Sequence, residues 1–142
     1  MNGLVLAAAA ALVWFGMVIA ISFLEAPLKF RAPGITVPLG LGIGRIVFRA
    51  LNFCEAGLAL VVAPALVLAG SWHSGSFWLL AAIAILVIQL AVVRPVLGRR
   101  SARVLAGDAP AGRSRAHWVY VVFEAVKVIA LLIGAMLILT TI

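Results

Sequence analysis

The sequence is poor in acidic residues and in cysteine. Of its 142 residues only four are Asp or Glu, against eleven Lys or Arg, so the formal net charge at pH 7 is +7. The single Cys54 excludes an intrachain disulfide and a cysteine metal cage, and it indicates a small buried apolar residue. His, Cys, Asp and Glu nowhere cluster with metal-ligand spacing, so we expect no metal and no other cofactor.

Long polar stretches are also scarce, because hydrophobic residues make up 66% of the chain and charged residues 11%. The mean hydropathy is +1.28, which is too apolar for a soluble domain of this size. No basic domain separates from the apolar runs, so the positive charge does not indicate nucleic-acid binding. It favours contact with the anionic headgroups of a lipid bilayer.

Four apolar segments are long enough to cross about 30 Å of hydrocarbon as helices. The sequence therefore predicts an all-α bundle of four transmembrane helices, forming one integral membrane domain over residues 1–142. The first segment lacks a basic leader and is longer than the apolar part of a signal peptide, so we interpret it as a retained span. The predicted spans are about residues 3–24, 44–70, 77–95 and 118–141.

Basic residues are absent from the connection between the second and third spans, which is Gly70-Ser-Trp-His-Ser-Gly-Ser76. They gather instead in the other two connections and at the span ends beside them. This asymmetry predicts that those connections are cytoplasmic and that both termini lie on the other side. His73 and His117 then lie at opposite ends of the spans, so they cannot share one haem iron in a monomer.

The two halves of the chain carry a similar pattern, with a proline at the cytoplasmic turn and a glutamate in the returning helix. Pro27 and Glu55 stand nearly as far apart as Pro95 and Glu124. Two helical hairpins in the same orientation would be related by an axis along the membrane normal. The pattern indicates a possible tandem repeat, although it depends on few residues.

Ionisable residues inside membrane spans are functional candidates. At 100° per residue, His117, Tyr120, Glu124 and Lys127 share about 80° of the fourth span, and Arg45, Arg49, Asn52 and Glu55 share about 120° of the second. With Glu25, these nine residues are the candidate ligand-binding residues. Counting from the outer ends places Glu25, Arg45, Arg49, Glu55, Arg94, Glu124 and Lys127 in a charged layer at the cytoplasmic end of the bundle. The expected ion pairs are Glu55 with Lys127, Glu124 with Arg45 or Arg49, and Glu25 with the remaining arginine.

Two interpretations of this layer stay open. It is either a set of ion pairs that joins the helices or a pocket that binds an anionic headgroup, a small ion or a proton. Two interpretations also stay open for the glycines Gly40, Gly42 and Gly44. They either form a phosphate-binding loop before a helix or allow close packing or a short re-entrant turn.

The residues Glu25-Ala-Pro27, Lys29-Phe30, Gly44-Arg45, Phe48, Glu55 and His117 form a pattern that resembles small bacterial four-helix integral membrane proteins, mostly of unknown function. The resemblance implies a four-helix fold in the bacterial inner (cytoplasmic) membrane, and it implies no activity.

The function we expect is therefore that of a non-enzymatic membrane protein, either transporter-like or an accessory subunit. It would bind a small anionic or amphiphilic ligand at the cytoplasmic side and act as a homo-oligomer or within a larger membrane complex. The alternative is a membrane enzyme for a lipid-linked or quinone-type substrate. In that case Glu55 or Glu124 would accept a proton, and His117 or Tyr120 would donate one.

Overall fold

The computed structural model describes residues 2–107 and 115–142, and every long element within them is a helix. The predicted all-α fold with four candidate membrane spans is thereby confirmed. The four helical rods that are long and apolar enough to cross a membrane are Gly3–Arg31, Val37–Ala69, Ser74–Leu105 and His117–Leu139.

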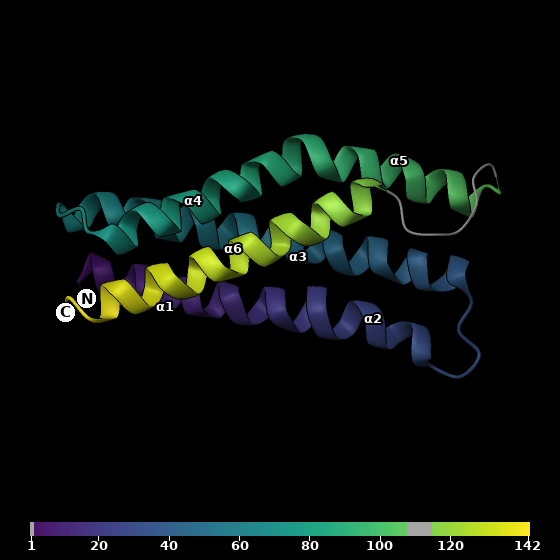
Figure 1. Ribbon diagram of the computed structural model, residues 1–142, viewed down its shortest axis with the longest axis horizontal. Coiled ribbons are helices and arrows are strands. Elements are labelled where there is room, and N and C mark those ends of the chain that lie inside the picture. The colour runs from purple at the N-terminus through teal and green to yellow at the C-terminus, as the bar shows by residue number, and fades with distance from the viewer. Residues whose placement is uncertain (1, 108–114) are drawn as a thin grey trace.

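Two of the rods are built from several helical segments. The first contains α1 (Gly3–Val18), the π-helical segment η1 (Ile19–Glu25), α2 (Ala26–Leu28) and the 3-10 turn η2 (Lys29–Arg31). The third contains α4 (Ser74–Ile88), the π-helical segment η3 (Gln89–Val93) and α5 (Arg94–Leu105). The second and fourth are α3 (Val37–Ala69) and α6 (Arg115–Leu139). Both termini and the α3–α4 connection lie at one end of the molecule, and the α2–α3 connection lies at the other (Figure 1).

Local signals in the sequence account for several helix ends. The Asn2 side chain accepts a hydrogen bond from the Leu4 amide at 3.1 Å, and the Thr36 hydroxyl accepts one from the Leu39 amide at 3.3 Å. These caps satisfy amides that have no partner in the first turn of a helix. Helix α3 ends at Gly70, whose φ of 67° is a left-handed conformation that glycine adopts without strain.

The helices extend further toward the basic end than predicted. Helix α3 begins at Val37 rather than near residue 44, and α5 continues to Leu105. The predicted third span, which ends at about residue 95, therefore stops short of the observed helix end at Leu105, and residues 108–114 lie outside the described part. Pro27 and Pro95 each follow a π-helical segment by two residues. The wider turn of a π-helical segment accommodates the proline ring, so the helical rod continues.

The core is formed where α1 packs against both α3 and α6, and where α4 packs against α6. Ala7, Ala8 and Ala11 are fully buried, as expected for small residues between membrane helices. A Cβ atom on Gly134 would lie 3.0 Å from the Gly75 carbonyl oxygen, so α4 and α6 touch through glycine. Gly57 makes no such contact, because this residue is exposed and a Cβ atom there would meet nothing within 4 Å.

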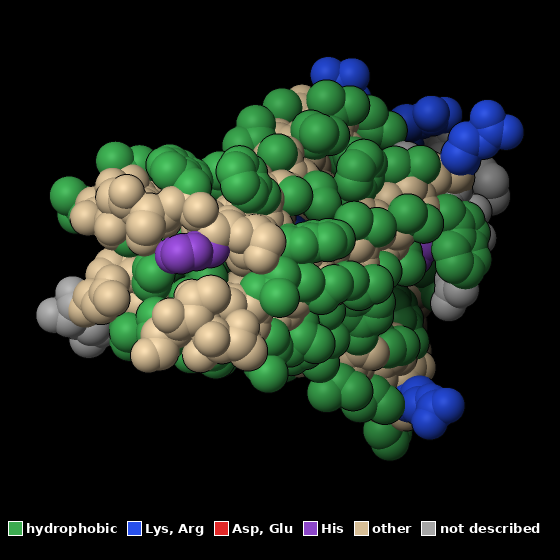
Figure 2. All heavy atoms as spheres, turned by 60° about the vertical axis from the view of Figure 1, so that its left-hand side comes forward, with side chains coloured by type: hydrophobic (Ala, Val, Ile, Leu, Met, Phe, Trp, Pro, Cys, Tyr) green, Lys and Arg blue, Asp and Glu red, His purple; other side chains and the backbone are tan. Residues whose placement is uncertain are grey.

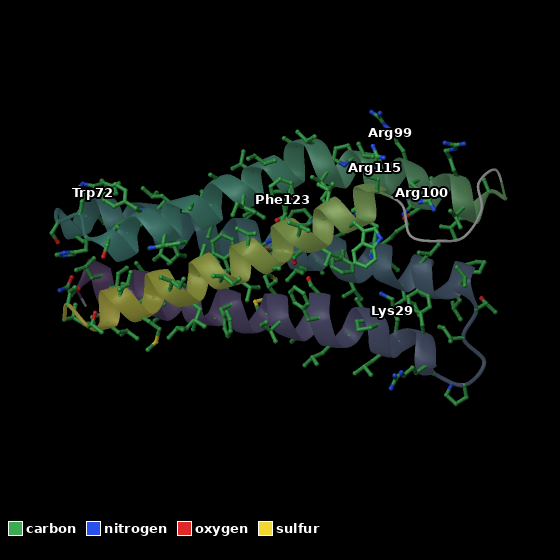
Figure 3. All side chains as sticks on the ribbon, viewed as in Figure 1. Lys29, Trp72, Arg99, Arg100, Arg115 and Phe123 are labelled. Atoms are coloured by element: carbon green, nitrogen blue, oxygen red, sulfur yellow. The ribbon has the colours of Figure 1, made fainter. Side chains whose placement is uncertain are left out.

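The face of the molecule shown in Figure 2 is largely apolar, and Lys and Arg gather toward one end of it. Phe53, Leu60 and Leu68 are 75–84% exposed, which suits side chains that face lipid. Trp72 lies at the end that carries the termini, and Lys29 lies in the opposite half with several arginines (Figure 3). The structure therefore has the charge segregation of a multi-pass membrane protein.

Candidate functional site

A lysine between two glutamates lies in the interior of the bundle. The Lys127 ammonium group is 2.5 Å from Glu55 Oε1 and 2.5 Å from Glu124 Oε1. All three side chains are at most 1% exposed. The predicted pairing of Glu55 with Lys127 is confirmed.

Neutral side chains from the other two rods complete this cluster. Trp14 Nε1 donates to Glu55 Oε1 at 2.8 Å, Ser22 Oγ donates to Glu124 Oε2 at 2.6 Å, and Gln89 Nε2 donates to Glu124 Oε1 at 2.8 Å. Lys127 also donates to the Gln89 amide oxygen at 2.7 Å. All four rods therefore meet in one buried network, which consists of Trp14, Ser22, Glu55, Gln89, Glu124 and Lys127.

The network explains how charges are tolerated in an apolar bundle. A buried charge is strongly destabilising unless it is paired and hydrogen-bonded. Lys127 and Glu124 each have three partners, while Glu55 Oε2 has none among the described residues. Most of the network is thus satisfied internally, so we interpret it chiefly as the structural joint of the bundle.

The other predicted ion pairs are wrong. Glu124 contacts Lys127, Gln89 and Ser22 rather than Arg45 or Arg49. Glu25 pairs with Lys29 at 3.6 Å rather than with an arginine. The sequence indicated which residues are charged, but the partners depend on how far each helix extends.

The predicted single charged layer is also wrong, because its members lie at different levels. Glu55 is about 21 Å along α3 from Ala69 and about 27 Å from Val37, at 1.5 Å per residue. It therefore lies near the middle of α3, hydrogen-bonded to Trp14 inside the first rod (Gly3–Arg31), rather than at the end of the bundle. The basic residues Arg45 and Arg49 lie closer to the start of α3 and are exposed.

A cavity of about 770 Å³ lies between the network and the basic end of the molecule. Its walls come from η1, α2, η2, α3, α5 and α6. Four cationic side chains line it, namely Lys29, Arg45, Arg94 and Arg100, together with His117. Apolar and aromatic residues form most of the remaining wall, and they include Phe23, Phe30, Leu41, Phe48, Leu97, Val104, Trp118 and Val121.

Aromatic rings connect the cations of this cavity. Lys29 Nζ and the Arg94 guanidinium carbon each lie 5.6 Å from the centre of the Phe48 ring. Tyr120 packs edge-on against Phe48 at 5.8 Å, and Arg94 lies 5.9 Å from the Tyr120 ring. These are cation–π distances, so the rings hold two positive charges in place. Lys29 also pairs with Glu25, whereas Arg94 has no acidic partner among the described residues.

The inner end of the cavity touches the buried network. Ser22 and Glu124 belong to both, and Tyr120 lies one helical turn from Glu124. His117, Tyr120 and Glu124, predicted to share one face, all line the cavity, whereas Lys127 lies behind them in the network. The Tyr120 hydroxyl is buried and has no hydrogen-bond partner among the described residues.

Two of the three glycines at the start of α3, Gly40 and Gly44, serve packing. A Cβ atom on Gly40 would lie 2.2 Å from the Phe30 ring, and one on Gly44 would lie 2.9 Å from Lys29 Nζ. Gly40, Gly42 and Gly44 all lie within α3. The alternatives of a phosphate-binding loop or a re-entrant turn are therefore wrong, since these residues are helical.

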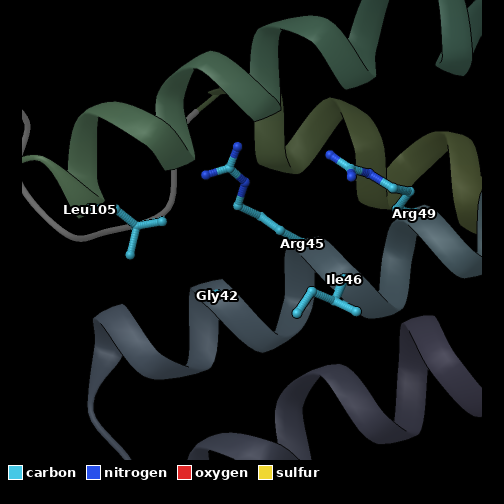
Figure 4. Close-up of a pocket in the computed structure, with 5 residues that line it drawn as sticks. All are labelled: Gly42, Arg45, Ile46, Arg49 and Leu105. Carbon is cyan, nitrogen blue, oxygen red and sulfur yellow. The ribbon is translucent and has the colours of Figure 1, made fainter.

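A smaller groove of about 250 Å³ lies between α3 and α5, and it is lined by Gly42, Arg45, Ile46, Arg49 and Leu105. Figure 4 shows the Arg45 and Arg49 side chains on the side of α3 that faces α5. No ion pair joins either arginine to an acid among the described residues. Asn52, half-buried, lines neither cavity.

The sequence analysis missed Trp14, Ser22 and Gln89 as functional candidates. Gln89 had a usable signal, because it is the one polar side chain in the apolar run from Phe77 to Val93. Trp14 and Ser22 had none, because their partners lie on rods that only the tertiary structure brings together.

Within residues 2–107 and 115–142, no group of three or more His, Cys, Asp and Glu side chains could hold a metal ion. Comparison of the chain with protein-family models, curated proteins and solved structures finds no match. The argument for function therefore depends on the geometry of the cavity.

Proposed function

We propose that this chain is an integral membrane protein that binds a small anionic amphiphile in the 770 Å³ cavity. The observation that carries the proposal is the composition of the wall. Among the described residues, four Lys and Arg side chains line it together with one acid, Glu124, which already pairs with Lys127. Lys29 pairs with Glu25. The proposal therefore depends on Arg45 and Arg94, which form no ion pair with an acid among the described residues. Apolar and aromatic side chains cover most of the rest, so an acidic group and a hydrocarbon body would both find partners.

The orientation we propose places the basic end in the cytoplasm and both termini outside, in the bacterial inner membrane. The clustering of Lys and Arg at one end supports this topology through the positive-inside rule. The exposed arginines of the groove, Arg45 and Arg49, would contact phosphates of anionic lipids there. A cysteine-accessibility map of the two termini and of the α3–α4 connection tests the orientation.

We also propose that the chain is a tandem repeat of two hairpins. A π-helical segment ends two residues before Pro27 in the first hairpin and two residues before Pro95 in the second. Each segment supplies one neutral donor, Ser22 or Gln89, to the same carboxylate of Glu124. This correspondence adds a structural element to the proline–glutamate pattern in the sequence.

A role in binding fits better than conduction by a single chain. Beyond the buried network, toward the termini, His73 is the one titratable side chain. No further charged groups would carry an ion to that side. An accessory or transporter-like subunit in a homo-oligomer or larger complex accords with this arrangement, and the mass of the particle in lipid nanodiscs tests it.

The binding function can be tested on purified protein in nanodiscs of zwitterionic lipid. We expect dodecanoate to bind and dodecyltrimethylammonium, which has an equal chain and opposite charge, not to bind. Arg94→Gln should weaken dodecanoate binding about tenfold, because a charge-assisted contact is lost. Arg103→Gln, an exposed change on α5 outside the cavity wall, is the matched control. Equal binding of the two amphiphiles would overturn the proposal.

A second candidate function follows from the presence of Tyr120 and Glu124 in one cavity wall. A membrane enzyme acting on a lipid-linked or quinone-type substrate would use Glu124 as proton acceptor and Tyr120 or His117 as donor. Glu55 lies behind them in the network and does not line the cavity. Conversion of extracted membrane lipids by the protein, lost in Glu124→Gln, would favour this alternative.

A further inference from the structure

The inner end of the cavity presents a hydrogen-bond donor that no described residue uses. Tyr120 is 6% exposed, lines the cavity, and its hydroxyl has no partner. Leaving a buried hydroxyl unpaired is destabilising. The site is therefore suited to a ligand oxygen that accepts this hydrogen bond.

A hydrogen-bond acceptor lies on the same face of α6. Glu124 Oε2 accepts the Ser22 hydroxyl at 2.6 Å, while Oε1 accepts both Gln89 and Lys127. Since a carboxylate oxygen accepts two hydrogen bonds, Oε2 has one position left. Tyr120 and Glu124 are four residues apart and thus neighbours on the helix. A ligand hydroxyl can accept a hydrogen bond from the Tyr120 hydroxyl and donate one to Glu124 Oε2.

Arg94, the cation of the cavity wall that contacts the Tyr120 ring, would place the acidic group of the ligand beside this pair. The Arg94 guanidinium carbon lies 5.9 Å from the Tyr120 ring centre, and both residues line the cavity. An acid bound by Arg94 therefore has the Tyr120 hydroxyl within the span of one small head group. We infer that the ligand is an anionic amphiphile with a hydroxyl next to its acidic group. This inference rests on the proposed function and specifies its ligand.

Three probes that share a chain length test the position of the hydroxyl. They are dodecanoate, its α-hydroxy derivative and its ω-hydroxy derivative, measured in the same nanodiscs. We expect the α-hydroxy acid to bind about tenfold tighter than dodecanoate, and the ω-hydroxy acid to bind no tighter than dodecanoate. Equal binding of all three, or tightest binding of the ω-hydroxy acid, would overturn the inference. Binding of none of them would overturn the proposed function itself.

Tyr120→Phe tests whether the preference for the α-hydroxy acid depends on the Tyr120 hydroxyl oxygen. Phenylalanine retains the ring that packs on Phe48 and Arg94, so dodecanoate binding should persist while the tenfold preference disappears. Ser101→Ala, which removes a hydroxyl elsewhere in the cavity wall, should leave the preference intact. A preference that survives in Tyr120→Phe would contradict the assignment. If this variant does not fold, the comparison of the three probes on the wild-type protein decides the question.

Discussion

The buried network and the cavity beside it are both polar regions of one bundle, but they differ in how their charges are balanced. In the network, one lysine lies between two glutamates and neutral donors fill most of the remaining positions. In the cavity, two cations face one aromatic ring, and a tyrosine hydroxyl has no hydrogen-bond partner among the described residues. Satisfied charges stabilise a fold, whereas unbalanced charge and open volume favour a ligand. We therefore interpret the network as a stabilising element and propose the cavity as the binding site.

The largest expected effect is on the network, through Lys127→Met. Removing the ammonium group leaves two carboxylates buried without a counter-charge, so we expect a loss of about 3–5 kcal/mol of stability. Thermal unfolding in detergent measures it. The triple variant Glu55→Gln/Glu124→Gln/Lys127→Met should recover part of the loss, because it contains no buried charge. If the triple variant is less stable than Lys127→Met, the electrostatic explanation is wrong.

Trp14→Phe tests the hydrogen bond from α1 to Glu55. The indole donates to a charged acceptor at 2.8 Å, and such bonds contribute about 1.5–3 kcal/mol. We expect this variant to be less stable than wild type while dodecanoate binding is retained, since Trp14 does not line the cavity. Trp78→Phe, at an exposed tryptophan on α4, is the control and should be neutral. Loss of dodecanoate binding in folded Trp14→Phe would contradict the separation between a stabilising network and a binding cavity.

Gly40→Ala tests the cavity wall by adding a methyl group instead of removing a polar one. The added methyl group would meet the Phe30 ring and push it from its position, so binding should change by several fold. Because a ring at an exposed position can move, the loss of stability should stay within about 1 kcal/mol. Gly42→Ala meets nothing within 4 Å and should leave binding unchanged. Equal effects of both substitutions on binding would contradict the contact.

The smallest expected effect belongs to the groove between α3 and α5. Arg49→Gln removes one exposed cation, so stability should change by less than about 1 kcal/mol. We expect fewer anionic lipids to remain bound in native mass spectrometry, while dodecanoate binding in the cavity stays the same, since Arg49 lines only the groove. Unchanged lipid retention would contradict the proposed phosphate contact.

Much of the fold could be predicted from the sequence, because hydropathy alone selects four helices in lipid. The helix ends could not be predicted, because the π-helical segments carry the first and third rods past Pro27 and Pro95. Helix α3 also begins at Val37 rather than near residue 44, so Glu55 lies farther from the end of the bundle than predicted. The nine candidate residues divide accordingly. Glu55, Glu124 and Lys127 belong to the network. Glu124 also lines the cavity, as do Arg45, His117 and Tyr120. Arg49 lines the groove, while Glu25 and Asn52 line neither the cavity nor the groove.

The sequence by itself determined the helical class, the four candidate spans and the asymmetry of charge, because each depends only on residue type and order. It also determined that Glu55 would need a buried cation, and Lys127 is the one lysine or arginine deep in a span. Only the tertiary structure decided that Trp14, Ser22 and Gln89 surround these charges while Lys29 and Arg94 share the Phe48 ring. Those contacts depend on the relative shift and rotation of separate rods, which no local pattern in the chain specifies.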